Sequence, residues 1–349
     1  MVIKKYLLVL LVVFCCTCSK KVSSGSNPPV GNDSTFTNPI LSSGPDPWVI
    51  QKDTNYYYTN TFGNRIAIYR TGKMSELNKA SAVTVWSPPA TGAYSKDIWA
   101  PELHFMQNKW YIYFAADDGN NASHRIYVLE NSSADPQSQS WTLKGKLADP
   151  TDKWAIDASV FDYNGQSYVT WSGWEGDING RQDIYIAKLS NPWTITGSRA
   201  MISTPVYAWE KNGAPPSVNE GPEIIRNTAG KIFLVYSASG CWSDDYALGL
   251  LTFKDGGDPL NPSDWTKSAN PVFTKSSANG AFGPGHPGFF KSRDGKEDWI
   301  IYHANTYTGQ GCDNNRNPRM QRFTWNADGT PNFGEPVKVN TPVKKPSGE

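Results

Sequence analysis

The chain has 349 residues, of which 33 are Lys or Arg and 32 are Asp or Glu. This near balance of charge argues against nucleic acid as a partner, because nucleic-acid-binding proteins usually present a strongly basic face. Aromatic residues make up 13% of the chain, including 14 Trp and 17 Tyr. Such a composition suits a β-rich core, and it also suits a cleft in which rings stack on sugars.

The first residues indicate a targeting segment. "MVIKKYLLVLLVVFCC" places two lysines before an apolar run that is too short to span a membrane and suits a secretory signal. The segment resembles a bacterial lipoprotein signal, so we expect residues 1–18 to be the signal peptide and Cys18, or alternatively Cys16, to carry lipid. Residues 19–36 are expected to form a flexible tether. The protein would then be exported, periplasmic or at the cell surface, and would meet the membrane only through its lipid; a plain cleaved signal is the alternative.

Residues 37–349 indicate one all-β domain. Short runs rich in Val, Ile, Tyr, Trp and Phe alternate with turns rich in Gly, Asn, Asp and Pro. One unit recurs: a start marked by an acid or a proline, an apolar strand, a polar turn and an aromatic strand. The five copies read "DPWVIQKDTNYYYTN", "PELHFMQNKWYIYFA", "ASVFDYNGQSYVTWS", "GPEIIRNTAGKIFLVYS" and "HPGFFKSRDGKEDWIIYHA".

These copies start 55 to 65 residues apart, at Asp46, Pro101, Ala158, Gly221 and His286. Between them lie further strand-like runs such as "RIAIYRTG" and "HRIYVLENS". A period of this size with about four strands per unit is typical of a β-propeller. We therefore predict a five-bladed β-propeller. A β-sandwich, or a pair of sandwiches, is the alternative, but neither requires five spaced copies of one hairpin.

Three acids stand near the starts of repeats: Asp46 in "GPDPWV", Asp157 in "AIDASVF" and Glu220 in "SVNEGPEII". The innermost strands of a propeller line the channel with the same polarity, so residues at their starts gather at one end. We expect the three carboxyl groups to converge on one pocket. A buried carboxyl group near other acids has a raised pKa, whereas one near a cation stays ionised. Glycoside hydrolysis uses this division, with one carboxyl as acid and another as base.

The motifs "GPDPWV", "DIWAPELHF", "IDASVFDYNGQSYVTWSG", "NEGPEI" and "GPGHPGFF" resemble the blade signatures of glycoside hydrolase family 43 over residues 37–338. The resemblance implies a five-bladed propeller that acts with inversion on arabinose- and xylose-containing polysaccharides. It also implies that Asp46 is the general base, that Glu220 is the general acid, and that Asp157 orients Glu220 and tunes its pKa. Inversion requires room for a water molecule, so we expect Asp46 and Glu220 to lie about 6.5–9.5 Å apart.

The resemblance extends to residues around the pocket. Trp99 is expected to line it, with a core position as the alternative. An arginine from "CDNNRNPRMQRFTW" is expected to contact the sugar or the general acid; spacing favours Arg316, and Arg319 is the alternative. Phe62 in "NTFGN" is a candidate stacking residue, and Trp242 in "SGCWSDDY" is expected to form a wall of a subsite.

His286 is expected at the channel as the fifth blade's counterpart of the acids. There the resemblance implies a possible structural calcium or sodium ion, while the chemistry is expected to need no cofactor. Glu102 and Glu223 are expected to make structural hydrogen bonds. Cys241 and Cys312 either form a disulfide, which an exported protein permits, or remain buried thiols.

The leading functional hypothesis is a monomeric, exo-acting α-L-arabinofuranosidase for plant cell-wall arabinan, or for arabinose-decorated xylan or pectin. The insertions "WSPPATGAYSKD" and "GWEGDINGRQD" are expected to wall the pocket, which favours exo action. A β-xylosidase or an endo-α-1,5-arabinanase would use the same acids. A non-catalytic carbohydrate-binding lipoprotein and a protein-interaction propeller are alternatives from other classes.

Overall fold

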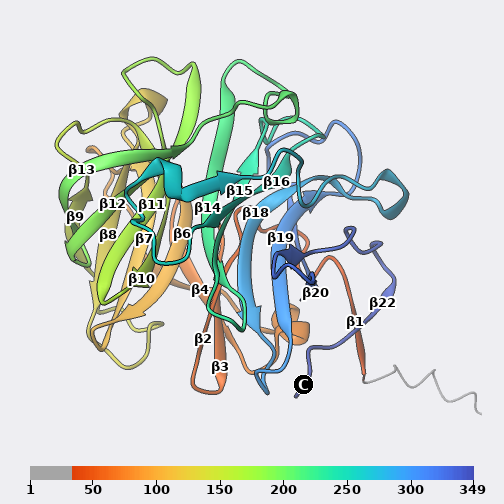
Figure 1. Cartoon of the computed structure of the whole chain (residues 1–349). Helices are drawn as coiled ribbons and strands as arrows, with labels where there is room; N and C mark the ends of the chain where they lie inside the picture. Colours follow the sequence, from red (N-terminus) through yellow and green to blue (C-terminus); the bar gives the residue numbers. More distant parts are fainter. Residues whose placement is uncertain (1–33) are drawn as a thin grey trace, which may run out of the picture. The chain divides into compact units, whose positions relative to one another are not determined.

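The structure is a computed structural model that describes residues 34–349. The expected signal peptide with Cys18 lies outside the described residues, as does most of the expected tether. No helix in the described part of the chain is long and apolar enough to cross a membrane. Within residues 34–349, twenty strands form five successive groups of four antiparallel strands (Figure 1).

Each group is one blade, and its strands pair in chain order. Blade one comprises β2 (Trp48–Lys52), β3 (Asn55–Thr59), β4 (Ile66–Thr71) and β5 (Val83–Trp86). Blade two comprises β6 (Lys96–Met106), β7 (Lys109–Asp117), β8 (Arg125–Asn131) and β9 (Thr142–Leu147). Blade three comprises β10 (Ala155–Tyr163), β11 (Gln166–Gly173), β12 (Arg181–Asn191) and β13 (Thr194–Ser203).

Blade four comprises β14 (Ser217–Arg226), β15 (Ile232–Ala238), β16 (Ala247–Phe253) and β17 (Trp265–Lys267). Blade five comprises β18 (Phe282–Lys291), β19 (Asp298–Asn305), β20 (Asn317–Trp325) and β21 (Pro331–Asn332). Short 3₁₀ helices interrupt the loops: η1 (Met74–Lys79), η2 (Asn121–Ser123), η3 (Ala208–Glu210), η4 (Pro262–Asp264) and η5 (Ser277–Asn279).

The first strands of the blades form a closed ring. β2 contacts β6, β6 contacts β10, β10 contacts β14, β14 contacts β18, and β18 contacts β2. Each of these strands is therefore the innermost strand of its blade and borders the central channel. The predicted five-bladed β-propeller is confirmed.

The core lies between neighbouring blades, because alternate residues of a strand face opposite sides of its sheet. In β7, Trp110 and Ile112 pack toward blade one, whereas Tyr111 and Tyr113 pack toward blade three. Five such clusters of buried apolar side chains occupy the five interfaces between blades. Burial of one large apolar side chain contributes about 1.5–3 kcal/mol, so these interfaces hold the ring together.

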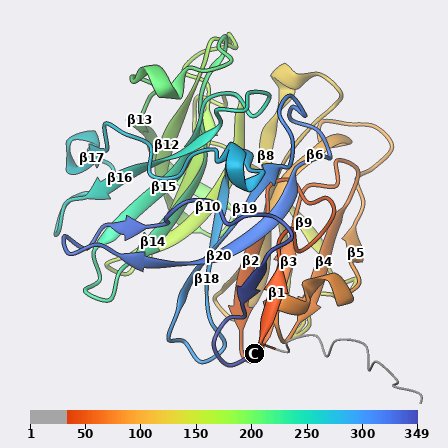
Figure 2. The same cartoon turned by 90° about the vertical axis from the view of Figure 1, so that its right-hand side faces the viewer.

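The two ends of the described chain help to close the ring. β1 (Thr35–Thr37) pairs with β22 (Pro342–Lys344), so the C-terminus lies close to β1 in both views (Figures 1 and 2). The Asn38 side-chain amide makes the two hydrogen bonds that a neighbouring strand would make with Met320. Its Nδ2 donates to the carbonyl of Met320 at 2.8 Å, and its Oδ1 accepts from the N–H of Met320 at 2.9 Å. These bonds tie the segment leading to blade one onto β20 of blade five.

One residue near the start of each inner strand has a left-handed backbone. The φ values lie between 41° and 56° at Asp46, Ala100, Asp157, Gly221 and His286. In blades two to five the pairing of the inner strand is interrupted at this point, which is the signature of a β-bulge. A bulge redirects side chains, and here it directs them to the end of the channel where the inner strands begin.

This register corrects one expectation from the repeats. Asp46, Asp157 and His286 occupy the same left-handed position, but Glu220 lies one residue earlier, before Gly221. The residue equivalent to Glu220 in blade two is Trp99. The aligned copies start at Ala158 and Gly221, which sets Asp157 opposite Glu220, whereas the left-handed positions show that Gly221 is the equivalent of Asp157.

Asn38→Ala tests the closure of the ring. The substitution leaves the buried N–H and C=O of Met320 without partners, and each such group costs about 1–3 kcal/mol. We expect a loss of about 2–4 kcal/mol in the free energy of unfolding, measured by chemical denaturation. Asn326→Ala, at an exposed asparagine, is the matched control and should change stability by less than about 0.5 kcal/mol. A comparable, small effect of both substitutions would contradict the role of Asn38.

Candidate active site

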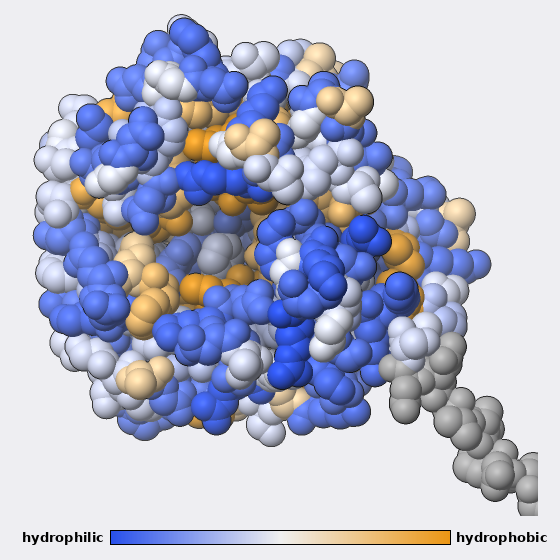
Figure 3. All heavy atoms as spheres, turned by 60° about the horizontal axis from the view of Figure 1, so that its bottom comes forward, coloured by the Kyte–Doolittle hydropathy of each residue, from blue (hydrophilic) through white to orange (hydrophobic). Residues whose placement is uncertain are grey.

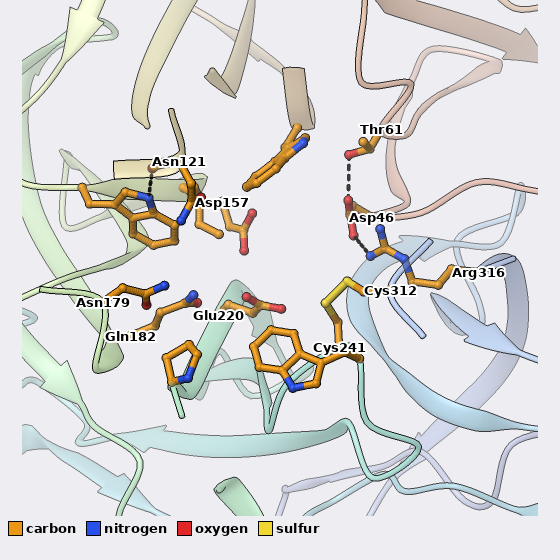
Figure 4. A pocket seen from close by; sticks show the side chains of 15 residues that line it. Asp46, Thr61, Asn121, Asp157, Asn179, Gln182, Glu220, Cys241, Cys312 and Arg316 are labelled. Carbon is orange, nitrogen blue, oxygen red and sulfur yellow. Dashed lines mark hydrogen bonds and ion pairs between the residues drawn. A yellow bond between two sulfur atoms is a disulfide. The ribbon is translucent and has the colours of Figure 1, made fainter. Parts of the chain in front are cut away.

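A cavity of about 370 Å³ lies at the end of the channel where the inner strands begin. Residues from all five blades line it (Figure 4): Asp46, Thr61, Trp99, Asn121, Trp154, Ile156, Asp157, Asn179, Gln182, Pro216, Glu220, Cys241, Trp242, Cys312 and Arg316. The structure thus brings Asp46, Asp157 and Glu220 together, as the repeat predicted.

A second cavity, of about 320 Å³, lies further along the inner strands and contains none of these three acids. It includes apolar side chains of inner strands, among them Ile50, Val160 and Ile224. Figure 3 shows that the face below the molecule, relative to Figure 1, is hollowed and has hydrophobic residues inside the hollow. The three acids singled out from the repeats therefore belong to the first cavity.

Asp46 is held as a carboxylate by donors on both of its oxygens. Arg316 Nη1 donates to Oδ1 at 2.8 Å, and Thr61 Oγ1 donates to Oδ2 at 2.7 Å. The Nδ1 atoms of His286 and His303 each lie 3.5 Å from Oδ1. Burial alone would raise the pKa of Asp46, but the Arg316 guanidinium, the two imidazoles and the Thr61 hydroxyl lower it well below its usual value. Asp46 is ionised at neutral pH.

The surroundings of Glu220 instead favour the protonated form of its carboxyl group. Burial, and after it the negative charge of Asp46, raise the pKa of its carboxyl group to about 7, although the Tyr246 hydroxyl and Arg316 oppose the rise. Tyr246 donates a hydrogen bond to Oε1 at 2.8 Å. Its ring stacks on His303, with centroids 5.7 Å apart, and leaves no room for a side chain at Gly285, where a Cβ would lie 2.1 Å from the ring. Glu220 is therefore oriented and partly protonated near neutral pH.

Asp157 is tied to the backbone that carries Glu220. Its Oδ2 accepts a hydrogen bond from the N–H of Gly221 at 3.0 Å. Burial raises the pKa of Asp157 well above its usual value, and the charges of Glu220 and Asp46 add to the rise. This contact gives Asp157 a direct means of fixing the position of Glu220.

The structure distinguishes between the two arginines. Arg316 lines the cavity and pairs with Asp46, the expected general base; its expected contact with the sugar or the general acid stays a prediction. Arg319 is fully buried and donates to the carbonyls of Gly280 and Asn305. It supports the fold and does not line the cavity.

Of the three aromatic residues expected at the pocket, two line the cavity and one does not. Trp99 lines the cavity and stacks on His124, with ring centroids 4.0 Å apart. Trp242 lines the cavity and remains 45% exposed. Phe62 does not line it; the Arg65 guanidinium covers its ring at 4.2 Å, so the stacking role expected for Phe62 is wrong.

Only one of the two expected wall insertions reaches the cavity. The segment 173–183 contributes Asn179 and Gln182. The segment 86–97 contributes no lining residue, because Trp86 and Tyr94 pack against each other and against neighbouring core rings. Its aromatic residues serve the interface between blades one and two.

His286 faces Asp46, as described above. No group of three or more His, Cys, Asp or Glu side chains among residues 34–349 is arranged to hold a metal ion. The structural calcium or sodium ion expected at His286 stays a prediction. Further along the channel, Glu102 contacts His104 at 2.9 Å and Glu223 accepts from Ser159 at 3.0 Å, which are the structural hydrogen bonds expected for these glutamates.

Cys241 and Cys312 form a disulfide that lines the cavity. Sequence reasoning missed Thr61, Tyr246 and His303 as partners of the acids. Thr61 is next to Phe62, and Tyr246 ends the quoted run "SGCWSDDY", but nothing in either local sequence indicates a contact with the acid that lies 15 or 26 residues earlier in the same blade. Only the contact of His303 with Asp46 joins blade five to blade one and therefore requires the closed ring.

One ionised carboxylate and one carboxyl group that retains its proton near neutral pH, both facing a cavity with amide and aromatic walls, define the site of a glycoside hydrolase. A family model described as "Glycosyl hydrolases family 43" matches residues 36–331, which is most of the chain. The chain belongs to glycosyl hydrolase family 43.

Individual relatives show which members of this family the chain is similar to. The chain is 42% identical over 325 residues to an extracellular exo-α-(1→5)-L-arabinofuranosidase of Streptomyces avermitilis, covering 90% of this chain and 67% of that protein. It is 38% identical to α-L-arabinofuranosidase 43 of Humicola insolens, covering 88% of this chain and 65% of that protein. The chain therefore spans about two thirds of the length of these relatives.

A solved structure of an α-L-arabinofuranosidase from Lactobacillus brevis superposes with a TM-score of 0.83 and is 38% identical. It covers 88% of this chain, which in turn covers 98% of that structure. A thermostable family-43 glycoside hydrolase has a TM-score of 0.75 at 28% identity. All residues that line the cavity lie within the family match over residues 36–331.

Tyr246→Phe tests the control of Glu220. Removal of the hydroxyl removes a donor that favours the ionised form, so the pKa of Glu220 should rise above about 7. The pKa can be measured by titrating the carboxyl ¹³C resonance of Glu220. Tyr302→Phe, whose hydroxyl bonds to Gln321, is the control and should leave that pKa unchanged. An unchanged or lower pKa in Tyr246→Phe would contradict the assignment.

Proposed function

We propose that the protein is an inverting, exo-acting α-L-arabinofuranosidase that releases arabinose from plant arabinan or from arabinose-decorated xylan or pectin. The observation that carries the proposal is the difference in protonation between Asp46 and Glu220 within one cavity. The arabinofuranosidase relatives support the choice of sugar.

Asp46 acts as the general base. Its two oxygens accept from Arg316 and Thr61, but each carboxylate oxygen has a second lone pair that can accept from a water molecule. The carboxylate removes a proton from this water as the water attacks the anomeric carbon. Direct attack by water inverts the anomeric configuration, so no covalent intermediate forms.

Glu220 acts as the general acid. Tyr246 occupies Oε1, which leaves Oε2 to carry the proton and deliver it to the glycosidic oxygen. A carboxyl group with a pKa near 7 holds its proton at neutral pH and still transfers it readily, which is the best compromise for general acid catalysis. Asp157 fixes the backbone beside Glu220 through Gly221 and is a positioning residue.

The other lining residues bind the sugar. The side-chain amides of Asn121, Asn179 and Gln182 supply hydrogen-bond donors and acceptors for hydroxyl groups, and Trp99 supplies an apolar face. The bounded volume of about 370 Å³ supports a pocket for one terminal sugar with its neighbour, and so exo action. Trp242, exposed at the wall, is placed to contact the sugar that leaves.

Carboxyl groups and water suffice for this reaction, so no cofactor takes part. The signal-like N-terminal sequence, with Cys18 as its lipid-bearing residue and a tether after it, supports export to the periplasm or cell surface. The tether expected over residues 19–36 must end before Thr35, because Thr35–Thr37 form β1 and Phe36 is buried. The extracellular Streptomyces relatives also support export. We expect the catalytic part, residues 37–349, to be monomeric.

The direct test is to incubate the purified protein with native arabinan, debranched arabinan, arabinoxylan and a panel of p-nitrophenyl glycosides. Chromatography of released sugars should show free arabinose and no oligosaccharides, and ¹H NMR should show the β-anomer first, since the substrate is α-linked. Release of xylose alone would instead identify a β-xylosidase. A ladder of arabino-oligosaccharides would identify an endo-arabinanase. No release from any substrate would support a binding protein.

The two catalytic roles can be separated by the leaving group. On arabinan, Glu220→Gln and Asp46→Asn should each lower kcat by about 10²–10⁴-fold, the usual contribution of a general acid or base. On 2,4-dinitrophenyl α-L-arabinofuranoside the leaving phenolate needs no proton, so Glu220→Gln should recover most of its rate and Asp46→Asn should not. Asp162→Asn, at an exposed hairpin position, is the control and should match the wild type. Equal losses for both variants on both substrates would contradict the assignment.

A further inference from the structure

The Cys241–Cys312 disulfide joins loops of two different blades at the wall of the cavity. Cys241 follows β15 of blade four, and Cys312 lies in the segment 306–316 between β19 and β20 of blade five. The two cysteines are 71 residues apart in the sequence, and both line the cavity. Blade packing does not itself require this connection, because neither cysteine lies in a strand.

The segment 306–316 carries Arg316 to the cavity without any regular secondary structure. Many of its hydrogen bonds are local: Gln310 Oε1 accepts from the N–H groups of Thr306 and Tyr307, and Asn305 Nδ2 donates to the carbonyl of Gly311. Such bonds shape the loop but do not fix it against the neighbouring blade. Tyr307, which is 69% exposed, shows how little core the loop contains.

Two contacts fix the middle of this segment to blade four. One is the disulfide. The other is Asp244, whose carboxylate accepts from the N–H of Gly309 at 2.9 Å and from the hydroxyl of Thr308. The end of the segment is held separately, because the carbonyl of Arg316 accepts from the N–H of Gly44 at 3.0 Å.

A short chain of contacts leads from the disulfide to Asp46. Asp313 follows Cys312 directly, and its carbonyl accepts from Arg316 twice, from the backbone N–H at 3.3 Å and from Nε at 3.2 Å. The Nη1 of the same guanidinium donates to Asp46 Oδ1 at 2.8 Å. Figure 4 shows the disulfide and Arg316 on the same side of the cavity, with Arg316 directed at Asp46.

We propose that Cys241 and Cys312 are positioning residues for the catalytic base: their bond fixes the Asp313 carbonyl, which holds the Arg316 guanidinium against Asp46. The proposal rests on the function proposed above. An arginine side chain loses considerable rotamer freedom when it forms one ion pair, and a pre-positioned carbonyl reduces that loss in the folded protein. Without the disulfide, the ion pair between Arg316 and Asp46 would be formed for only part of the time.

A bridge that closes a long loop also constrains the unfolded chain, so a change in melting temperature alone would not distinguish positioning from general stabilisation. The test must therefore measure coupling between the disulfide and Arg316. Four proteins are needed: the wild type, Cys241→Ser/Cys312→Ser, Arg316→Ala and the combined triple variant. Each is assayed for kcat and KM on arabinan, well below its melting temperature.

We expect the cysteine pair variant to lose about tenfold in kcat with a smaller change in KM, because the base and not the sugar contacts is disturbed. In the triple variant the cysteine substitutions should have no further effect beyond that of Arg316→Ala, which is the result for residues that act through one another. Effects that multiply in the triple variant, or a cysteine pair variant within twofold of the wild type, would overturn the proposal. Phe333→Leu, in the blade-five core, is the stability control and should lower the melting temperature without changing kcat.

Amide hydrogen exchange tests the anchoring without any assay of activity, so it separates this proposal from the proposed function. Peptides covering 306–316 should exchange faster in the cysteine pair variant, whereas peptides of β19 should not. If that variant does not fold, dithiothreitol can reduce the folded wild type: the reagent becomes a cyclic disulfide as the two sulfurs take up two electrons and two protons. Unchanged exchange in 306–316 after loss of the bridge would overturn the proposal.

Discussion

Three carboxyl groups gathered around one cavity, those of Asp46 and Asp157 buried and that of Glu220 half-buried, cannot all be ionised, and the site depends on this electrostatic constraint. Asp46 keeps its charge because Arg316 and Thr61 donate to both of its oxygens. Glu220 has a single donor, Tyr246, and faces the negative charge of Asp46, so it retains a proton near neutral pH. The difference between an acid and a base thus arises from neighbours and not from the carboxyl groups themselves.

The propeller supplies this arrangement through its backbone. A left-handed residue near the start of each inner strand directs side chains to the same end of the channel, at Asp46, Asp157 and His286 among others. Non-glycine residues in this conformation are unfavourable and persist only where the surroundings enforce them. The apolar interfaces between blades hold these residues in the left-handed conformation. The hydrogen bonds of Asn38 keep the first and last blades in register.

Much of this could be predicted from the sequence. The period of the hairpins and the alternation of aromatic residues are local properties, so the blades and the convergence of the acids followed from them. The partner of Arg316 did not follow, because its contact with Asp46 spans 270 residues and depends on how the last blade meets the first. Thr61 and Tyr246 contact acids of their own blades, 15 and 26 residues earlier in the chain, and were missed because the local sequence does not show which loop residue turns toward the acid. Phe62 was misjudged because its local sequence does not show that Arg65 covers the ring.

The central claim is the difference in protonation between Asp46 and Glu220, and neutron diffraction from crystals grown in deuterated buffer near pH 6 would measure it directly. The account predicts deuterium on Glu220, at the oxygen opposite Tyr246, and none on Asp46. Deuterium on Asp46, or a fully ionised Glu220 at that pH, would contradict it.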